Sequence, residues 1–274
     1  MSVEPPFPEL DELLSIIGET GTRMCEIEAS EGAAGNISIC IGWGIDPRRK
    51  FPIEEPYRLP QSVPGLANRV VIVTGSGRRL REIEKDPVAN LGVVRIGSDG
   101  ETGTIYTSPK KLFSKPTSEF NSHLAIHEHQ VMQSGTNFNA IVHAQPTHLT
   151  FLSHIPAYQD ERTFNKSVLR WQPELIVQIP EGIGLIPFHV PGSESLMRST
   201  LSSLEKHRIV VWAKHGVMAR SSTSLKRAAD TIEYAETGAK YEFMNIQAGS
   251  KALGLSEEEI QSICQAFNVT QSIF

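Results

Sequence analysis

Two histidines in this sequence lie where a run of apolar, largely β-branched residues comes to an end. Residues 139–142 lead into His143, and residues 208–213 lead toward His215. Such runs predict buried strands, and a strand end holds a side chain rigidly at an open edge, as a metal ligand or catalytic base requires. A lone histidine at a strand end is more commonly a hydrogen-bonded structural residue. A functional role for either histidine therefore needs support from other candidate functional residues in the sequence.

A turn rich in glycine and hydroxyl groups follows another predicted strand. Residues 69–73 run into Thr74, Gly75, Ser76 and Gly77. Exposed backbone N–H groups and two hydroxyls can form a nest for an anion such as phosphate, although a tight turn that needs glycine for its dihedral angles has the same composition. The segment lacks the Gly-Lys-Ser/Thr of a Walker A loop and the spacing of a dinucleotide fingerprint.

Residues 116–119, Pro-Thr-Ser-Glu, begin a predicted helix that ends near Gly135. Thr117 or Ser118 can cap this helix, and its positive end favours an anion. Glu119 in the first turn fits a carboxylate that complements the helix dipole.

The same helix carries His123, His127, Glu128 and His129 at spacings that place some of them on one face. Their order is not that of an HExxH zinc motif. We therefore expect this cluster to form a polar outer face of the helix.

The remaining pattern predicts an α/β protein. Apolar residues at helical spacing predict further helices over residues 8–29, 147–154, 193–207, 222–248 and 256–267. Short apolar or alternating runs predict strands over residues 36–41, 90–97, 103–107, 174–179, 183–190 and two halves of 208–219. Residues 43–67 read as a long surface excursion, a candidate functional loop or subunit contact. With no repeat or linker, we expect one domain over residues 1–274, built as a three-layer α/β/α sandwich around a mixed sheet.

Composition excludes several classes of function. The 274 residues are 39% hydrophobic and 21% charged, with a net charge of -5, so no electrostatic footprint for nucleic acid or an anionic membrane exists. Three widely spaced cysteines, Cys25, Cys40 and Cys264, suit neither a disulfide framework nor a zinc knuckle. The first residues lack a signal-peptide pattern and no later run approaches membrane-spanning length, so we expect a cytoplasmic protein that acts on a small molecule.

Several stretches in register carry a resemblance to a known family. They are residues 35–38 (Gly-Asn-Ile-Ser), 73–77 (Val-Thr-Gly-Ser-Gly), 86–92 (Asp-Pro-Val-Ala-Asn-Leu-Gly), 116–119 (Pro-Thr-Ser-Glu), 142–144 (Val-His-Ala), 180–184 (Pro-Glu-Gly-Ile-Gly) and 214–217 (Lys-His-Gly-Val). In this order they resemble the class II sugar-phosphate aldolases of the aldolase/adducin type, over residues 10–267. Within the family, the long segment before Arg69 and the sequence of residues 86–92 resemble a branch of longer members more than the shorter members.

The resemblance implies a largely antiparallel central sheet and a site for each key residue. His143 and His215 would bind a catalytic Zn²⁺ or another divalent metal, and Glu119 would remove and return a proton at the donor carbon. Glu174 would come from a neighbouring subunit of a cyclic homotetramer. The residues implied to hold the phosphate and enediolate are Gly35, Asn36, Ser76, Gly77, Thr117 and Ser118. The implied reaction cleaves a ketose 1-phosphate to dihydroxyacetone phosphate and an aldehyde.

Two positions depart from the family pattern. The family has a His-x-His pair on the His143 strand, whereas this chain has Gln145, whose neutral amide is a poorer zinc ligand than imidazole. The sequence leaves Gln145, Glu119, His148 and His189 open as the third ligand. Ala33 stands where members carry an asparagine that helps to hold the donor, which argues for a changed substrate.

Two alternatives to the aldolase follow from these departures. One is another lyase, an epimerase or a dehydratase of the same fold that acts on a different sugar phosphate. The other is a non-catalytic, metal-free oligomeric protein, as adducin heads are. The retained Glu119 and the two histidines argue against the second, because a scaffold needs no base next to metal ligands.

Overall fold

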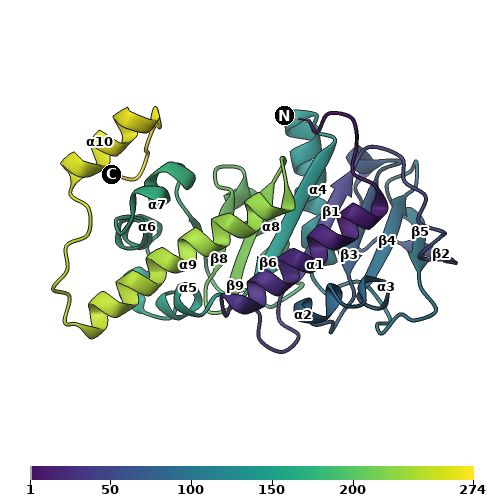
Figure 1. The fold of residues 1–274 in the computed structure, drawn as a ribbon, viewed down its shortest axis with the longest axis horizontal. Coiled ribbons are helices and arrows are strands. Elements are labelled where there is room, and N and C mark those ends of the chain that lie inside the picture. The colour runs from purple at the N-terminus through teal and green to yellow at the C-terminus, as the bar shows by residue number, and fades with distance from the viewer. Residues whose placement is uncertain (1) are drawn as a thin grey trace.

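The computed structural model describes residues 2–274, which form a mixed sheet between two layers of helices (Figure 1). The strands are β1 (Asn36–Ile41), β2 (Ile53–Arg58), β3 (Val70–Thr74), β4 (Leu91–Ile96), β5 (Thr102–Thr107), β6 (Phe138–Ala144), β7 (Gly184–Ile186), β8 (Ile209–Trp212) and β9 (Gly216–Ser221). Their order is β2-β5-β4-β3-β1-β6-β9-β8-β7, with β7 and β8 parallel and the other neighbours antiparallel. This confirms the predicted three-layer fold with a largely antiparallel sheet.

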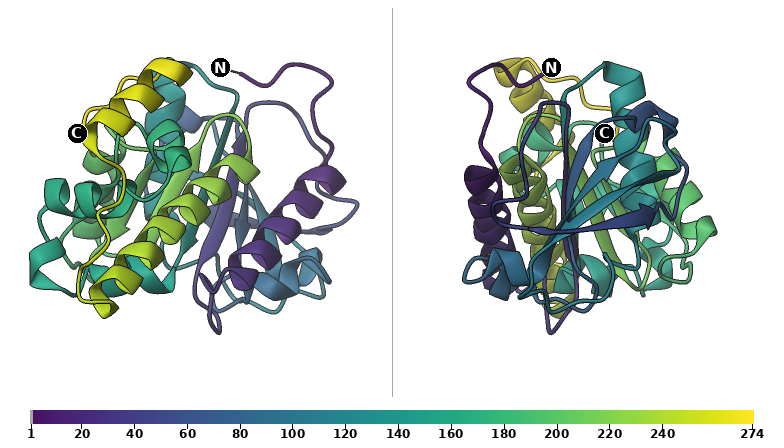
Figure 2. Two further views of the ribbon diagram at one scale, coloured as in Figure 1. Left: turned by 60° about the vertical axis from the view of Figure 1, so that its left-hand side comes forward. Right: turned by 90° about the vertical axis from the view of Figure 1, so that its right-hand side faces the viewer.

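The helices cover both faces of this sheet. They are α1 (Leu10–Glu26), α2 (Leu80–Ile83), α3 (Pro87–Asn90), α4 (Phe120–Ser134), α5 (Thr147–Leu152), α6 (Glu161–Leu169), α7 (Pro173–Gln178), α8 (Glu194–Leu204), α9 (Leu225–Gln247) and α10 (Glu257–Phe267), with 3-10 turns at Pro64–Leu66 and Pro156–Tyr158. In the edge-on view of Figure 2, α1 and α9 lie on one side of the sheet, and α4 and α8 lie on the other. The C-terminal α10 packs against α7.

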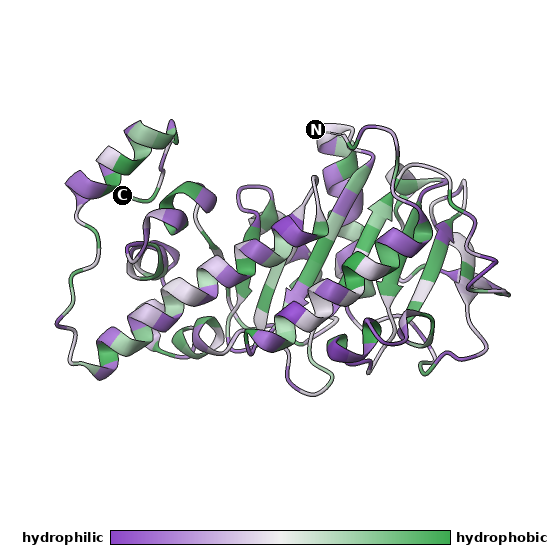
Figure 3. Ribbon diagram, viewed as in Figure 1, coloured by the Kyte–Doolittle hydropathy of each residue, from purple (hydrophilic) through white to green (hydrophobic). Residues whose placement is uncertain are grey.

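Strand alternation explains the two layers. Along β1, Ile37 and Ile39 point into the core shared with α1 and α9. Cys40, on the opposite face of the strand, packs with Phe120 and Leu124 of α4. The strands are accordingly apolar along most of their length (Figure 3). The edge strand β2 is largely polar, and among the buried polar residues of the inner strands are Asn36 and His143, which belong to the site described below.

Residues 174–179, predicted as a strand, form the helix α7 instead. Pro173 occupies its first turn, where its fixed φ favours a helix start and its missing N–H costs nothing. A short apolar run cannot by itself distinguish a strand from a buried helix, which explains the wrong prediction. Within residues 183–190, only β7 is a strand, and Pro187 directly follows it and cannot donate to the ladder.

Residues 43–67 are not wholly irregular, because they contain the edge strand β2. This strand pairs antiparallel with β5, from Ile53 opposite Thr107 to Arg58 opposite Thr102. The described part of the chain holds no helix long and apolar enough to cross a lipid bilayer.

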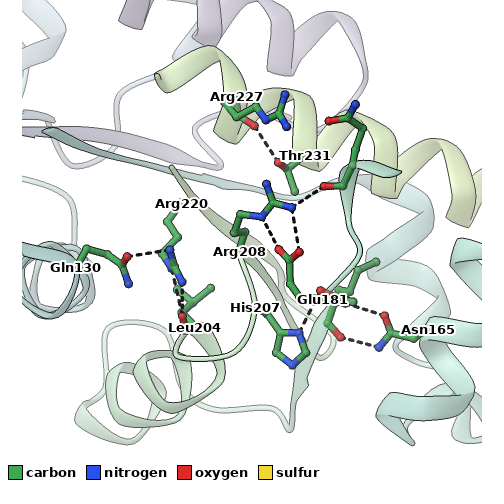
Figure 4. Close-up of polar contacts among 12 residues, drawn as sticks. Gln130, Asn165, Glu181, Leu204, His207, Arg208, Arg220, Arg227 and Thr231 are labelled. Atoms are coloured by element: carbon green, nitrogen blue, oxygen red, sulfur yellow. Dashed lines mark hydrogen bonds and ion pairs between the residues drawn. The ribbon is translucent and has the colours of Figure 1, made fainter. Parts of the chain in front are cut away.

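Polar contacts fix the end of the β8–β9 hairpin that lies opposite the turn carrying His215 (Figure 4). The Arg208 guanidinium pairs with the Glu181 carboxylate and donates to the Gln178 carbonyl at 2.8 Å. The Asn165 side chain brackets Ile183 by donating to its carbonyl and accepting from its N–H. The Arg208 bonds attach the 178–184 loop to the start of β8, and the Asn165 bonds attach it to α6.

Candidate active site

Three side chains from different parts of the chain converge at one point. Glu119 directly precedes α4, His143 lies near the end of β6, and His215 lies in the turn between β8 and β9. Glu119 Oε2 is 3.6 Å from His143 Nε2, and Glu119 Oε1 is 3.7 Å from His215 Nε2. The three ligand atoms lie within 4.8 Å of one another, and the carboxylate is 4% exposed. Two imidazoles and a carboxylate at this spacing suit a divalent metal.

His143 is oriented by a hydrogen bond, and the surroundings of His215 favour its neutral form. His143 Nδ1 donates to the Val217 carbonyl at 2.8 Å, which leaves Nε2 facing Glu119. Its ring packs against Trp212 and against His215. Burial, followed by the neighbouring His143, lowers the pKa of His215 to about 4, although the Glu119 charge opposes this shift. The donor set therefore fits a divalent ion.

Asn36 connects the sheet to the carboxylate. It is the register partner of His143 across the β1–β6 ladder, and its Nδ2 donates to Glu119 Oε2 at 2.6 Å. Gly35, directly before it, has φ +84°, and a Cβ at that position would lie 2.9 Å from the His143 carbonyl oxygen. A side chain there would strain the backbone and displace β6, the strand that carries His143.

The two segments predicted to bind phosphate lie side by side next to Glu119. Gly75 and Pro116 form an antiparallel bridge, and the Thr117 N–H donates to the Thr74 carbonyl at 3.0 Å. Ser76 is half-buried, whereas Gly77 and Ser118 are exposed, so this pair of segments opens to solvent beside the buried carboxylate. Gly77 has φ +70° with open space around it, as a turn glycine should. The predicted phosphate residues are thus brought together with Asn36 and Glu119.

Gln145 lies one residue beyond β6, and its backbone N–H donates to the Ala29 carbonyl at 2.7 Å. It lines a cavity of about 580 Å³ with Cys25, Glu28 and other residues, but not with Glu119 or the site histidines.

Of the other candidates for the third metal ligand, the two histidines have hydrogen-bond partners elsewhere. His148 Nδ1 pairs with Glu236 at 2.6 Å, and His189 bonds to Ser199 at 3.1 Å. Of these candidates, Glu119 is the one that lies with His143 and His215.

Glu174 is exposed in the first turn of α7 and does not belong to the Glu119 group. Ala33 is exposed in the turn before β1. A role for Glu174 in a neighbouring subunit's site stays a prediction.

The prediction that His123 and His127 form a polar outer face is wrong. Both side chains are fully buried between α4 and the sheet. Ser38 Oγ lies 2.6 Å from His123 Nδ1 and 2.7 Å from His127 Nε2. Ser38 of β1 and Asn139 of β6 are polar residues within two buried strands, and they are the sequence signal that could have located these histidines.

Comparisons with known proteins show the family to which this sequence belongs. The family model of the Class II Aldolase and Adducin N-terminal domain matches residues 17–243. The chain is 32% identical over 212 residues to a rhamnulose-1-phosphate aldolase of Escherichia coli O7:K1, which covers 77% of this chain and 76% of that protein.

Solved structures share the fold. A sugar-phosphate aldolase from Thermotoga maritima has a TM-score of 0.75 at 26% identity, covering 88% of this chain and 97% of that one. An L-fuculose-1-phosphate aldolase from Thermus thermophilus has a TM-score of 0.55 at 16% identity, covering 89% and 98%, which bears on the fold alone. The chain belongs to the class II aldolase and adducin family.

Proposed function

We propose that this protein is a metal-dependent aldolase that cleaves a ketose 1-phosphate related to rhamnulose 1-phosphate into dihydroxyacetone phosphate and an aldehyde. The observation that carries the proposal is the convergence of Glu119, His143 and His215, with their ligand atoms within 4.8 Å. The relatives named as aldolases support the reaction class.

Glu119, His143 and His215 would hold a Zn²⁺ or another divalent ion. Such an ion, when bound, supplies a Lewis acid for the ketone and adjacent hydroxyl of the substrate. Asn36 holds one oxygen of Glu119, so the other oxygen is available to take a proton from the hydroxyl of the cleaved bond or to return one at the donor carbon. Burial of this carboxylate keeps bulk water from competing for the proton.

The phosphate of the substrate would lie at the opening beside Glu119. Backbone N–H groups and hydroxyls of residues 76–77 and 117–118, with Gly35 and Asn36, provide neutral donors for it.

A neighbouring subunit would complete the site with Glu174. The exposed position of this carboxylate on α7, outside the Glu119 group, is compatible with a role across an interface. We therefore propose a cyclic homotetramer with its active sites between subunits.

The test is an assay of ketose phosphates with the Zn²⁺-, Mn²⁺- or Co²⁺-loaded protein. Release of dihydroxyacetone phosphate and an aldehyde from a 1-phosphate supports the aldolase. Isomer formation or dehydration without carbon–carbon cleavage would instead identify the same-fold alternative that Gln145 and Ala33 suggest. No turnover across the panel, with metal bound, would favour the non-catalytic reading.

A further inference from the structure

A continuous chain of buried polar side chains runs from Glu119 into the layer between α4 and the sheet. It consists of Asn36 and Ser38 of β1, His123 and His127 of α4, and Asn139 of β6. The distances are 2.6 Å from Glu119 to Asn36, 2.5 Å from Asn36 to His123, 2.6 Å from His123 to Ser38, 2.7 Å from Ser38 to His127, and 2.8 Å from His127 to Asn139. Ser38, both histidines and Asn139 are fully buried.

The donors and acceptors of this series of hydrogen bonds can be assigned in order, starting from Glu119. Asn36 donates through Nδ2 to Glu119, so its amide oxygen Oδ1 faces His123 and must accept from His123 Nε2–H. A neutral His123 then accepts at Nδ1 from the Ser38 hydroxyl.

The same logic fixes the second half. Because the Ser38 hydroxyl donates to His123, its oxygen accepts from His127 Nε2–H. His127 Nδ1 in turn accepts from Asn139 Nδ2. Every hydrogen bond in the chain therefore points toward Glu119.

The neutral form of both imidazoles agrees with their surroundings. Burial lowers the pKa of His123 well below its ordinary value, with further lowering by His127 and His143. Burial, followed by the nearby Arg69 charge, lowers the pKa of His127 to about 3. Aligned hydrogen bonds in a low-dielectric layer strengthen one another, so each donor reinforces the next.

We infer that this chain fixes the Asn36 amide with its NH₂ group toward Glu119, and thereby sets the orientation in which Glu119 meets the metal and the substrate. Ser38, His123 and His127 are positioning residues, since none of them contacts the metal group directly. The inference rests on the proposed function only for what Glu119 then does. The hydrogen-bond direction itself is a property of the folded chain.

The first test reads the direction without using activity. Protein labelled with ¹⁵N-histidine would be studied metal-free at about pH 7, where His⁺ would otherwise begin to form. The two signals lost in H123Q and H127Q assign the residues, and both should show the neutral Nε2–H tautomer in the unmodified protein. An Nδ1–H tautomer at either residue, or a charged ring, would overturn the inference.

The second test separates positioning from packing. H127L removes the donor to Ser38, whereas H127Q keeps a side-chain N–H that can replace it. Breaking one neutral hydrogen bond at a distance should lower kcat about 10-fold in H127L and in S38A with KM changed less than about 3-fold, and H127Q should recover most of the loss.

Cys40→Ala is the matched control. Cys40 lies on the same face of β1 as Ser38 and is equally buried, but it is not part of the hydrogen-bonded series of side chains. Its kcat should stay within about 2-fold of the parent. Equal losses in H127L, H127Q and C40A would assign the effect to packing and contradict the inference. If the protein cleaves no ketose phosphate at all, the proposed function fails while the tautomer test still decides the hydrogen-bond direction.

Discussion

Asn36 and His143 are register partners in the β1–β6 ladder, and their side chains reach the same carboxylate oxygen. Asn36 Nδ2 lies 2.6 Å from Glu119 Oε2, and His143 Nε2 lies 3.6 Å from it. Two neighbouring strands thus place a hydrogen-bond donor and a proposed metal ligand next to one carboxylate. A site built on paired strands is more precise than one built on loops alone.

Replacing Glu119 by glutamine should abolish most activity while leaving the fold intact. The amide keeps an oxygen to accept from Asn36 but cannot carry a proton between substrate atoms. We expect kcat to fall by about 10² to 10⁴ with little change in Tm.

The matched control for this variant is Glu128→Gln in the same helix. Glu128 accepts a hydrogen bond from the Gly65 N–H and lies outside the metal group, so its kcat should be nearly unchanged. An E119Q enzyme that kept more than about a tenth of the parental kcat would contradict the role of Glu119 as the base.

Metal affinity should depend on His143 far more than on Gln145. Because Gln145 lines the adjacent cavity, Q145A should weaken Zn²⁺ binding less than about 10-fold, whereas H143A should weaken it more than about 100-fold. Competition with a chromophoric chelator measures both. Equal losses in the two variants would make Gln145 the third ligand. Q145H, which restores the family's histidine pair, should bind Zn²⁺ more tightly than the parent.

Glu174 can be tested by mixing defective chains. If each site uses Glu119 of one subunit and Glu174 of its neighbour, E119Q and E174Q tetramers are each inactive. Co-assembly of the two chains in equal amounts should restore about a quarter of the sites in a cyclic assembly. If the mixed assembly is no more active than the two variants measured separately, Glu174 does not complete the site of a neighbouring subunit.

Acid should destabilise this protein partly through His127. Its pKa is about 3 in the folded chain and 6.5 when unfolded, so below pH 6.5 the unfolded state binds a proton that the folded state does not. The contribution of His127 is fully present above 6.5 and is lost progressively as the pH falls toward 3, at up to about 1.4 kcal/mol per pH unit. Urea unfolding of H127Q between these values should show a slope smaller by about one proton. Identical slopes would mean that His127 is not held neutral.

Most strands of the sheet could be predicted from the sequence, because each strand has a local pattern of residues that is typical of β-structure. The apolar, β-branched runs that became β1, β3 and β6 identified themselves by composition and alternation. The positions of His143 and His215 at strand ends followed directly, although their distance from each other did not. Convergence depends on the strand order, which brings β6 beside β9.

The buried histidines were missed because α4 is covered on more than one side. It packs against α8, β6 and the turn at Pro64–Leu66, so residues away from its main apolar stripe are still buried. A helix is usually expected to bury one stripe and expose the opposite face. Here the ring nitrogens of His123 and His127 form hydrogen bonds in the layer between α4 and the sheet. Helical periodicity in a sequence does not predict such hydrogen bonds.

The most direct test of the central claim counts metal on the protein. Protein stripped with a chelator and reloaded with Zn²⁺ should retain about one ion per chain, and H215A should lose it because a three-ligand site becomes a two-ligand one. Cleavage activity should return in proportion to the ion bound. Unmodified protein that folds normally but cannot be loaded with a divalent metal would contradict the account, because the proposed reaction has no electrophile without one.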